Sequence, residues 1–166
     1  MYKKGFTFVE ILLYLTIATM LLGTISVLMV TIYEGRIKNS VVREVEIEGE
    51  RAVRTMMYII RNGQSISSPA QGLTGSSLTL AVDNLTNSPT IFDLDQGRVR
   101  MTEGAQTPHY LTNDTVEVTG LTFHNLSYAG TSGTVYILMN IRYINQTGRG
   151  EYDYQKIFQT SVSLRP

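Results

Sequence analysis

An uncharged stretch near the N-terminus constrains this chain more than any other feature of its sequence. It runs from Ile11 to Tyr33, 23 residues without a charged side chain or a proline. At about 1.5 Å of rise per residue, a helix of this length measures roughly 34 Å and would cross a hydrocarbon core of roughly 30 Å. The sequence therefore predicts a single-pass membrane protein whose polar part follows the stretch.

The composition of the whole chain limits the remaining classes. Its 166 residues carry 14 basic and 14 acidic side chains and include no cysteine. Balanced charge provides no evidence for a nucleic-acid partner. Without cysteine there are no disulfides, thiolate nucleophiles or cysteine-based zinc sites. Together with the apolar stretch, this composition predicts a membrane protein rather than a soluble cytosolic enzyme.

The charges at the start of the chain predict its orientation. Lys3 and Lys4 precede the apolar stretch, and no small-residue cleavage site of the secretory type closes it near Ser26. The positive-inside rule then keeps the N-terminus cytoplasmic and exports the rest. Arg36 and Lys38 on the far side weaken this bias, but leading charges usually dominate.

Glu10 is the one acidic residue in the otherwise apolar N-terminal run. A lone carboxylate at a bilayer centre costs about 2.5–3.5 kcal/mol on insertion scales and less near the interface. One interpretation places Glu10 at the headgroup level, hydrated. The other gives it a charged partner, since ionisable residues in membrane helices usually have a function.

Residues 4–10, with the sequence KGFTFVE, run directly into this apolar helix. The arrangement resembles the N-terminus of type IV pilins and of the pseudopilins of type II secretion, although Phe8 and Val9 stand where Leu and Ile are commoner. The resemblance implies that a prepilin peptidase cuts between Gly5 and Phe6. It also implies N-methylation of the new Phe6 amine by the same enzyme.

The resemblance further implies that Glu10 meets the Phe6 amine of a neighbouring subunit in a filament. An α-amine with a pKa near 7.7–8.0 is largely cationic at neutral pH. Opposite charges about 4 Å apart attract by roughly 4 kcal/mol at an effective dielectric of about 20, before desolvation. Other implied partners are further pilins or pseudopilins, and indirectly a membrane platform and an assembly ATPase. The implied location is the bacterial cytoplasmic membrane, and then a periplasmic or cell-surface filament.

The helical pattern continues beyond the membrane to a stop at Asn62-Gly63. Glu50 with Arg54, and Glu48 with Arg51, have spacings that favour ion pairs on one helix. We expect the charged run from Arg43 to Arg54 to form a solvated helix face; the alternative is that part of it contacts neighbouring subunits. One apolar stripe should pack on a sheet, and its members are Val41, Val45, Ala52, Met56 and Ile59.

The remainder of the chain predicts a largely antiparallel sheet, and hence an α+β fold with one long helix. A register break at Gly120 predicts a bulge. Residues 69–75 form a turn-rich linker, and residues 95–97 and 128–133 connect hairpins. The predicted strands are residues 77–82, 90–94, 98–101, 116–128, 134–144 and 156–164.

This arrangement also resembles the J-type minor pseudopilins and related minor pilins. Similar phrases are residues 51–61, 77–80, 121–123 and 162–165. Many major pilins carry a proline about halfway along the membrane segment, where this chain has Val27. That difference favours a minor subunit over the filament shaft. The C-terminal cysteine pair of many Gram-negative pilins is missing.

The chain offers little catalytic or metal-binding chemistry. His109 and His124 have no second ligand at metal spacing. Residues 93–97 resemble a calcium loop only in part, because the third acidic position and the distal Glu are lacking. We therefore expect no enzymatic activity, no metal and no cofactor.

The sequence thus predicts a minor pilin or minor pseudopilin that is assembled into a type IV pilus-like or type II secretion filament. Residues 1–5 are the cleaved leader, 6–33 the transmembrane and filament-core helix, 34–62 its amphipathic continuation, and 63–166 a globular β-rich head. The alternatives are a major shaft pilin and a membrane-tethered adhesin or binding module in which Glu10 is incidental. A tethered hydrolase is the weakest candidate, because it lacks a nucleophile and a base.

Overall fold

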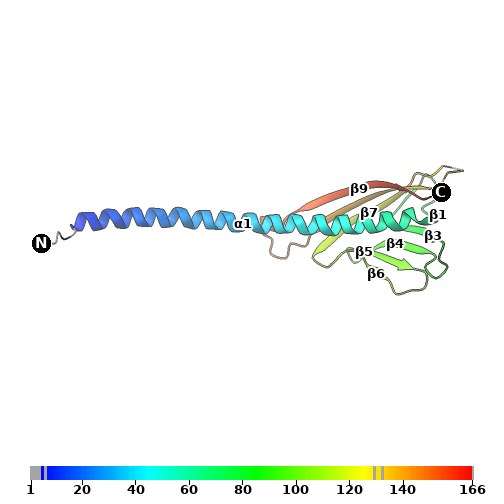
Figure 1. Cartoon of the computed structure of the whole chain (residues 1–166), viewed down its shortest axis with the longest axis horizontal. Helices are drawn as coiled ribbons and strands as arrows, with labels where there is room; N and C mark the ends of the chain where they lie inside the picture. The colour runs from blue at the N-terminus through cyan, green and yellow to red at the C-terminus, as the bar shows by residue number, and fades with distance from the viewer. Residues whose placement is uncertain (1–4, 6, 129, 132, 166) are drawn as a thin grey trace. The chain divides into compact units, whose positions relative to one another are not determined.

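The computed structural model describes residues 5, 7–128, 130–131 and 133–165 (Figure 1). Its longest element is the helix α1 (Phe8–Arg61), which is followed by strands and one short 3₁₀ helix, η1 (Gly150–Tyr152). The chain divides into two compact units, residues 1–39 and 40–166, and the boundary falls within α1.

The first unit consists of the N-terminal part of α1. Its side chains from Phe8 to Tyr33 are exposed except at Glu10, which is half-buried. No residue of this part contributes to the hydrophobic core. The helical prediction for the apolar stretch is therefore confirmed, and its apolar surface has no covering within the unit.

The second unit begins with the C-terminal part of α1, which buries one face. Val41, Val45, Ala52 and Met56 are buried, as their spacing predicts. The last member of the predicted stripe differs: Ile60 is fully buried, whereas Ile59 is only half-buried. Ile60 lies four residues after Met56, which continues the face better than a three-residue step at this end of the helix.

Five strands form the first sheet, in the order β1-β3-β4-β5-β6 with antiparallel pairing throughout. Gln96 and Gly97 connect β4 to β5 with φ angles of 49° and 73°. Two positive φ values match a type I′ turn, so the predicted hairpin is confirmed. The strands are β1 (Gly63–Ser68), β3 (Leu78–Val82), β4 (Thr90–Asp95), β5 (Arg98–Glu103) and β6 (His109–Tyr110).

Four strands form the second sheet, in the antiparallel order β2-β7-β8-β9. The pairing of β7 with β8 shifts register between Val118 and Gly120, so the predicted bulge is confirmed. The strands are β2 (Thr74–Gly75), β7 (Val116–Asn125), β8 (Thr134–Tyr143) and β9 (Gln155–Ser163). In Figure 1, β9 runs beside the part of α1 that belongs to this unit, and its Lys156 contacts Glu46 of the helix.

One hydrophobic core joins residues 40–61 of α1 to both sheets. Phe92 of the first sheet and Phe123 of the second are both fully buried in it. The α+β class with a long N-terminal helix on antiparallel strands is therefore confirmed, with two sheets in place of the single one expected. The division was not visible in the sequence because β1, β2 and β6 are short or polar and show no clear alternation of apolar residues.

Candidate functional site: the exposed helix and its carboxylate

Thr7 starts the helix that carries Glu10. The Glu10 backbone N–H lies 3.3 Å from the Thr7 hydroxyl oxygen and 3.1 Å from the Thr7 carbonyl oxygen. A threonine three residues before a glutamate is the sequence pattern of a capping box, and the threonine half of that box is formed here. Sequence reasoning missed this cap, although residues 7–10 display its pattern.

The Glu10 carboxylate is held by a tyrosine one turn later. The Tyr14 hydroxyl donates a hydrogen bond of 3.2 Å to Glu10 Oε1. Residues four apart lie on the same face of a helix, which explains the contact and why Glu10 alone in this segment is half-buried. Sequence reasoning missed Tyr14, and its spacing from the carboxylate was the available signal.

The serine and threonine side chains between residues 11 and 33 form hydrogen bonds within the helix itself. Five hydroxyl groups each donate to a backbone carbonyl three or four residues earlier, at 2.8–3.1 Å. Because lipid tails offer no hydrogen-bond partner, a spanning helix must satisfy its polar groups internally. These hydroxyls therefore add little cost to burial in hydrocarbon. They belong to Thr16, Thr19, Thr24, Ser26 and Thr31.

Among the described residues, α1 is the one helix long and apolar enough to cross a membrane, and its apolar window is exposed throughout. Such a helix is compatible with a single-pass membrane protein. An N-terminal signal sequence satisfies the same criteria of length and composition. Glu10 and Glu34 are the first charged residues met on either side of residues 11–33.

The predicted cleavage site is only partly described. Gly5 is exposed, and an added Cβ atom would meet nothing within 4 Å. The backbone at Gly5 is therefore open on the side where a side chain would stand. Phe6, Lys3 and Lys4 lie outside the described residues, and the leader charge, the cleavage junction and the N-methylation remain predictions.

The weaker candidates in the head do not come together as a site. His109 lies on β6, whereas His124 lies on β7 in the other sheet. His124 Nε2 lies 3.3 Å from the Gly72 carbonyl oxygen. Within the described ranges, no group of three or more histidine, aspartate or glutamate side chains could hold a metal ion.

Residues 93–97, considered above as a partial calcium loop, are the end of β4 and the turn to β5. Arg100 Nη2 lies 2.6 Å from Asp93 Oδ2, and Arg100 Nη1 lies 3.3 Å from Asp95 Oδ2. The Tyr110 hydroxyl donates to Asp95 at 2.7 Å, which raises the tyrosine pKa above its ordinary value. The hydrogen bonds that Arg100 donates to Asp93 likewise raise the pKa of Arg100. Both carboxylates therefore have protein partners.

A row of carboxylates on α1 connects the helix to the rest of the second unit. Lys156 Nζ lies 2.6 Å from Glu46 Oε1, and this hydrogen bond raises the pKa of Lys156. Glu48, only 6% exposed, accepts a 3.0 Å hydrogen bond from the Asn113 backbone N–H. The expectation of a solvated charged face is wrong at Glu48, because the loop before β7 covers it.

Comparison with known proteins gives no further assignment. No protein-family model, no curated protein and no solved structure matches the chain.

Proposed function

We propose that this chain is a structural subunit, a minor pilin or minor pseudopilin, of a type IV pilus-like or type II secretion filament. The proposal depends on one observation: the exposed apolar segment of α1 contains a single carboxylate, which lies close to its N-terminal end. Glu10 is the only charged residue between Gly5 and Glu34. An apolar helix without such a residue would serve equally well as a plain anchor.

Cleavage after Gly5 would place a cationic amine on Phe6, four residues before Glu10. In a filament, the amine of one subunit would meet the carboxylate of its neighbour within an apolar bundle. Removing one partner of a buried ion pair typically costs about 3–5 kcal/mol, because the other charge is left unpaired. A single pair of this strength fixes the axial position of neighbouring helices. Tyr14 supports this role by holding Glu10 Oε1.

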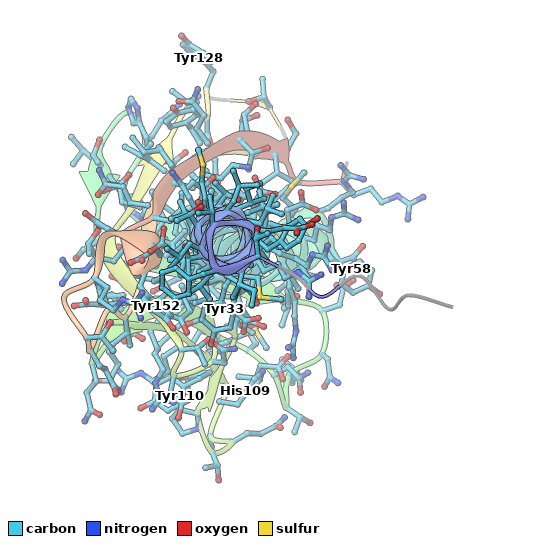
Figure 2. All side chains as sticks on the ribbon, turned by 90° about the vertical axis from the view of Figure 1, so that its left-hand side faces the viewer. Tyr33, Tyr58, His109, Tyr110, Tyr128 and Tyr152 are labelled. Carbon is cyan, nitrogen blue, oxygen red and sulfur yellow. The ribbon has the colours of Figure 1, made fainter. Side chains whose placement is uncertain are left out.

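The alternative of a tethered adhesin has its own supporting observation. Tyr58 and Tyr128 are 72% and 78% exposed and project from the ribbon in Figure 2. Exposed tyrosines supply binding surface at low entropic cost. They do not explain why a carboxylate stands within the apolar segment, so the filament subunit remains the preferred function.

The N-terminus of the mature protein tests processing directly. The protein is extracted from membranes of cells that contain a prepilin peptidase, and its N-terminal peptide is sequenced by mass spectrometry. We expect it to begin at Phe6 with one added methyl group. An intact Met1, or cleavage after Ser26, would contradict the proposal and favour a plain anchor or a secretory signal.

The role of Glu10 is tested by Glu10→Ala, with Glu34→Ala as the matched control at the other end of the apolar segment. Glu10→Ala should still insert into the membrane, because it removes a charge. Its incorporation into sheared filaments should fall at least about a hundredfold, given the cost of an unpaired amine. Glu34→Ala should assemble normally. Equal incorporation of both variants would refute the role of Glu10.

A further inference from the structure

The two sheets of the second unit have four edge strands, and three of them are protected. β2 and β6 are two residues long, and the pairing of β1 with β3 contains two register shifts. Short or irregular edges are usual means of preventing strand addition. β9 differs, because it is nine residues long and pairs with β8 without a register shift.

The ladder between β8 and β9 shows which backbone groups of β9 face outward. The Tyr143 N–H bonds to the Tyr154 carbonyl oxygen, and the Leu164 N–H bonds to the Gly133 carbonyl oxygen. Hydrogen-bonded pairs alternate along an antiparallel ladder, so the even-numbered residues of β9 bond to β8. The odd-numbered residues then direct their N–H and C=O groups away from the sheet. These residues are Gln155, Ile157, Gln159, Ser161 and Ser163.

The outward-facing backbone groups have no protein partner among the described residues. All five of these residues are exposed, and none is charged or a proline. The one charged residue of β9, Lys156, is bound to Glu46 on the helix. The edge thus lacks the free lysine, proline or bulge that usually blocks pairing with another chain.

We propose that β9 is a docking edge for β9 of a second copy of this chain, paired antiparallel about a two-fold axis. Centred on Gln159, this register places Ile157 opposite Ser161 of the second copy, and Gln155 opposite Ser163. No like charges face each other across it. Each opposed pair exchanges two backbone hydrogen bonds, and an isologous contact of this kind closes as a dimer.

The direction of β9 relative to α1 determines how the two copies are oriented in such a dimer. Lys156 contacts Glu46, the Phe158 ring lies against Gly49, and the Thr160 hydroxyl contacts Met57 Sδ. β9 therefore runs in the same direction as residues 40–61 of α1, as Figure 1 also shows. Antiparallel β9 pairing reverses these helical segments, so the contact joins heads that approach from opposite directions. It is separate from the assembly role proposed for Glu10.

The absence of cysteine allows a test with single cysteines in the full-length protein in detergent. In the proposed register, the two copies of residue 159 face each other with Cα atoms about 5.5 Å apart, within disulfide range. The two copies of residue 157 are offset by four residues, roughly 14 Å along the strands, beyond disulfide range. Gln159→Cys should therefore form a disulfide dimer on mild oxidation, whereas Ile157→Cys alone should not.

A mixture of Ile157→Cys and Ser161→Cys should give the mixed dimer, because these residues are opposite in the register. We expect at least about tenfold more dimer in the two matched cases than with Ile157→Cys alone. Replacing both Ile157 and Ser161 by Lys should abolish the Gln159→Cys dimer, and replacing both by Gln should preserve it. Equal cross-linking of all cysteine variants, cross-linking of none, or failure of the mixed pair would overturn the proposal.

Discussion

The two parts of α1 have similar helical geometry and opposite relations to their surroundings. Between Phe8 and Tyr33 the helix exposes its apolar side chains all round, whereas from Val41 to Ile60 it buries one face in the core of the head. An apolar surface on all sides suits a lipid or protein bundle, and a single apolar stripe suits a sheet. The angular distribution of the apolar residues in each part therefore indicates the environment that this part of the helix requires.

The polar groups of the two parts differ in the same way. Between Thr16 and Thr31 the hydroxyls bond to carbonyls of their own helix. Between Glu44 and Glu48 the carboxylates reach other elements of the head, including Asn113 and Lys156. A helix whose polar groups are all hydrogen-bonded within the helix can enter hydrocarbon. A helix whose side chains bond to neighbouring loops and strands is instead fixed within the fold of the head.

The largest expected difference between the two parts is in the effect of truncating a methionine. Met56 is fully buried in the head, and Met29 is exposed in the first unit. Met56→Ala should lower the free energy of unfolding of the head by about 2–5 kcal/mol. Met29→Ala should leave it unchanged. Urea denaturation of the detergent-solubilised chain, followed by near-UV circular dichroism, measures both, and equal effects would contradict the division into two units.

A glycine from each part should respond with opposite sign. A Cβ atom on Gly49 would stand 2.2 Å from the Phe158 ring, whereas one on Gly35 would meet nothing within 4 Å. Gly49→Ala should destabilise the head by about 1–3 kcal/mol through overpacking. Gly35→Ala should only raise the helix propensity of the first unit.

Combining Gly49→Ala with Phe158→Leu tests the cause. The combined destabilisation, measured by urea denaturation, should be smaller than the sum of the two single effects, because the clash is removed. Additive effects would mean that the ring does not limit the approach of the helix to β9.

Two glutamates of the head segment should also differ. Glu48 is buried and accepts from the Asn113 N–H, whereas Glu50 pairs with Arg54 at the surface. Glu48→Ala should cost about 1 kcal/mol or more of unfolding free energy, because a covered donor loses its partner. Glu50→Ala should cost only about 0.3–0.5 kcal/mol. If urea denaturation shows equal losses of unfolding free energy for the two variants, water must satisfy the Asn113 N–H when the Glu48 carboxylate is removed.

The smallest expected effect is a pH dependence at Lys156. The hydrogen bond to Glu46 raises the pKa of Lys156, so the folded state holds this proton more tightly. Its contribution to stability is full below the ordinary lysine pKa of about 10.4 and is lost as the pH rises through the folded value. The urea midpoints of the native chain and Lys156→Met should therefore differ at pH 8 and converge above that range. Lys38→Met, in the first unit, is the control and should leave the urea midpoint of the head unchanged.

Much of the head could be predicted from residue periodicity. The alternation of apolar residues predicted β8 at residues 134–144, one residue longer at its C-terminal end than the observed strand, and Gly120 predicted the bulge. The edge strand β1 was missed, because its sequence GQSISS has one large apolar residue, Ile66, and no alternation of buried positions. Edge strands are held by backbone pairing with a neighbour, which leaves little signal in their own sequence.

The candidate site, too, could be predicted from the sequence only in part. A charge within an apolar run is conspicuous, and Glu10 could be selected from the sequence alone. Its tyrosine partner and the cap at Thr7 depend on the helix starting at Phe8, because only then do residues 7, 10 and 14 take up these positions. Helix ends are set by local hydrogen bonding and are the least certain part of a sequence-based assignment.

The sequence by itself determined the long helix, its apolar segment, the lone acid and the α+β class, because these depend on local composition and on periods of two and 3.6 residues. Only the tertiary structure decided that the strands divide into two sheets, that Glu48 is buried, and that β9 is an open edge. These features depend on which distant segments meet. Burial and pairing at such contacts are set by the shape of the whole core, which no single segment encodes.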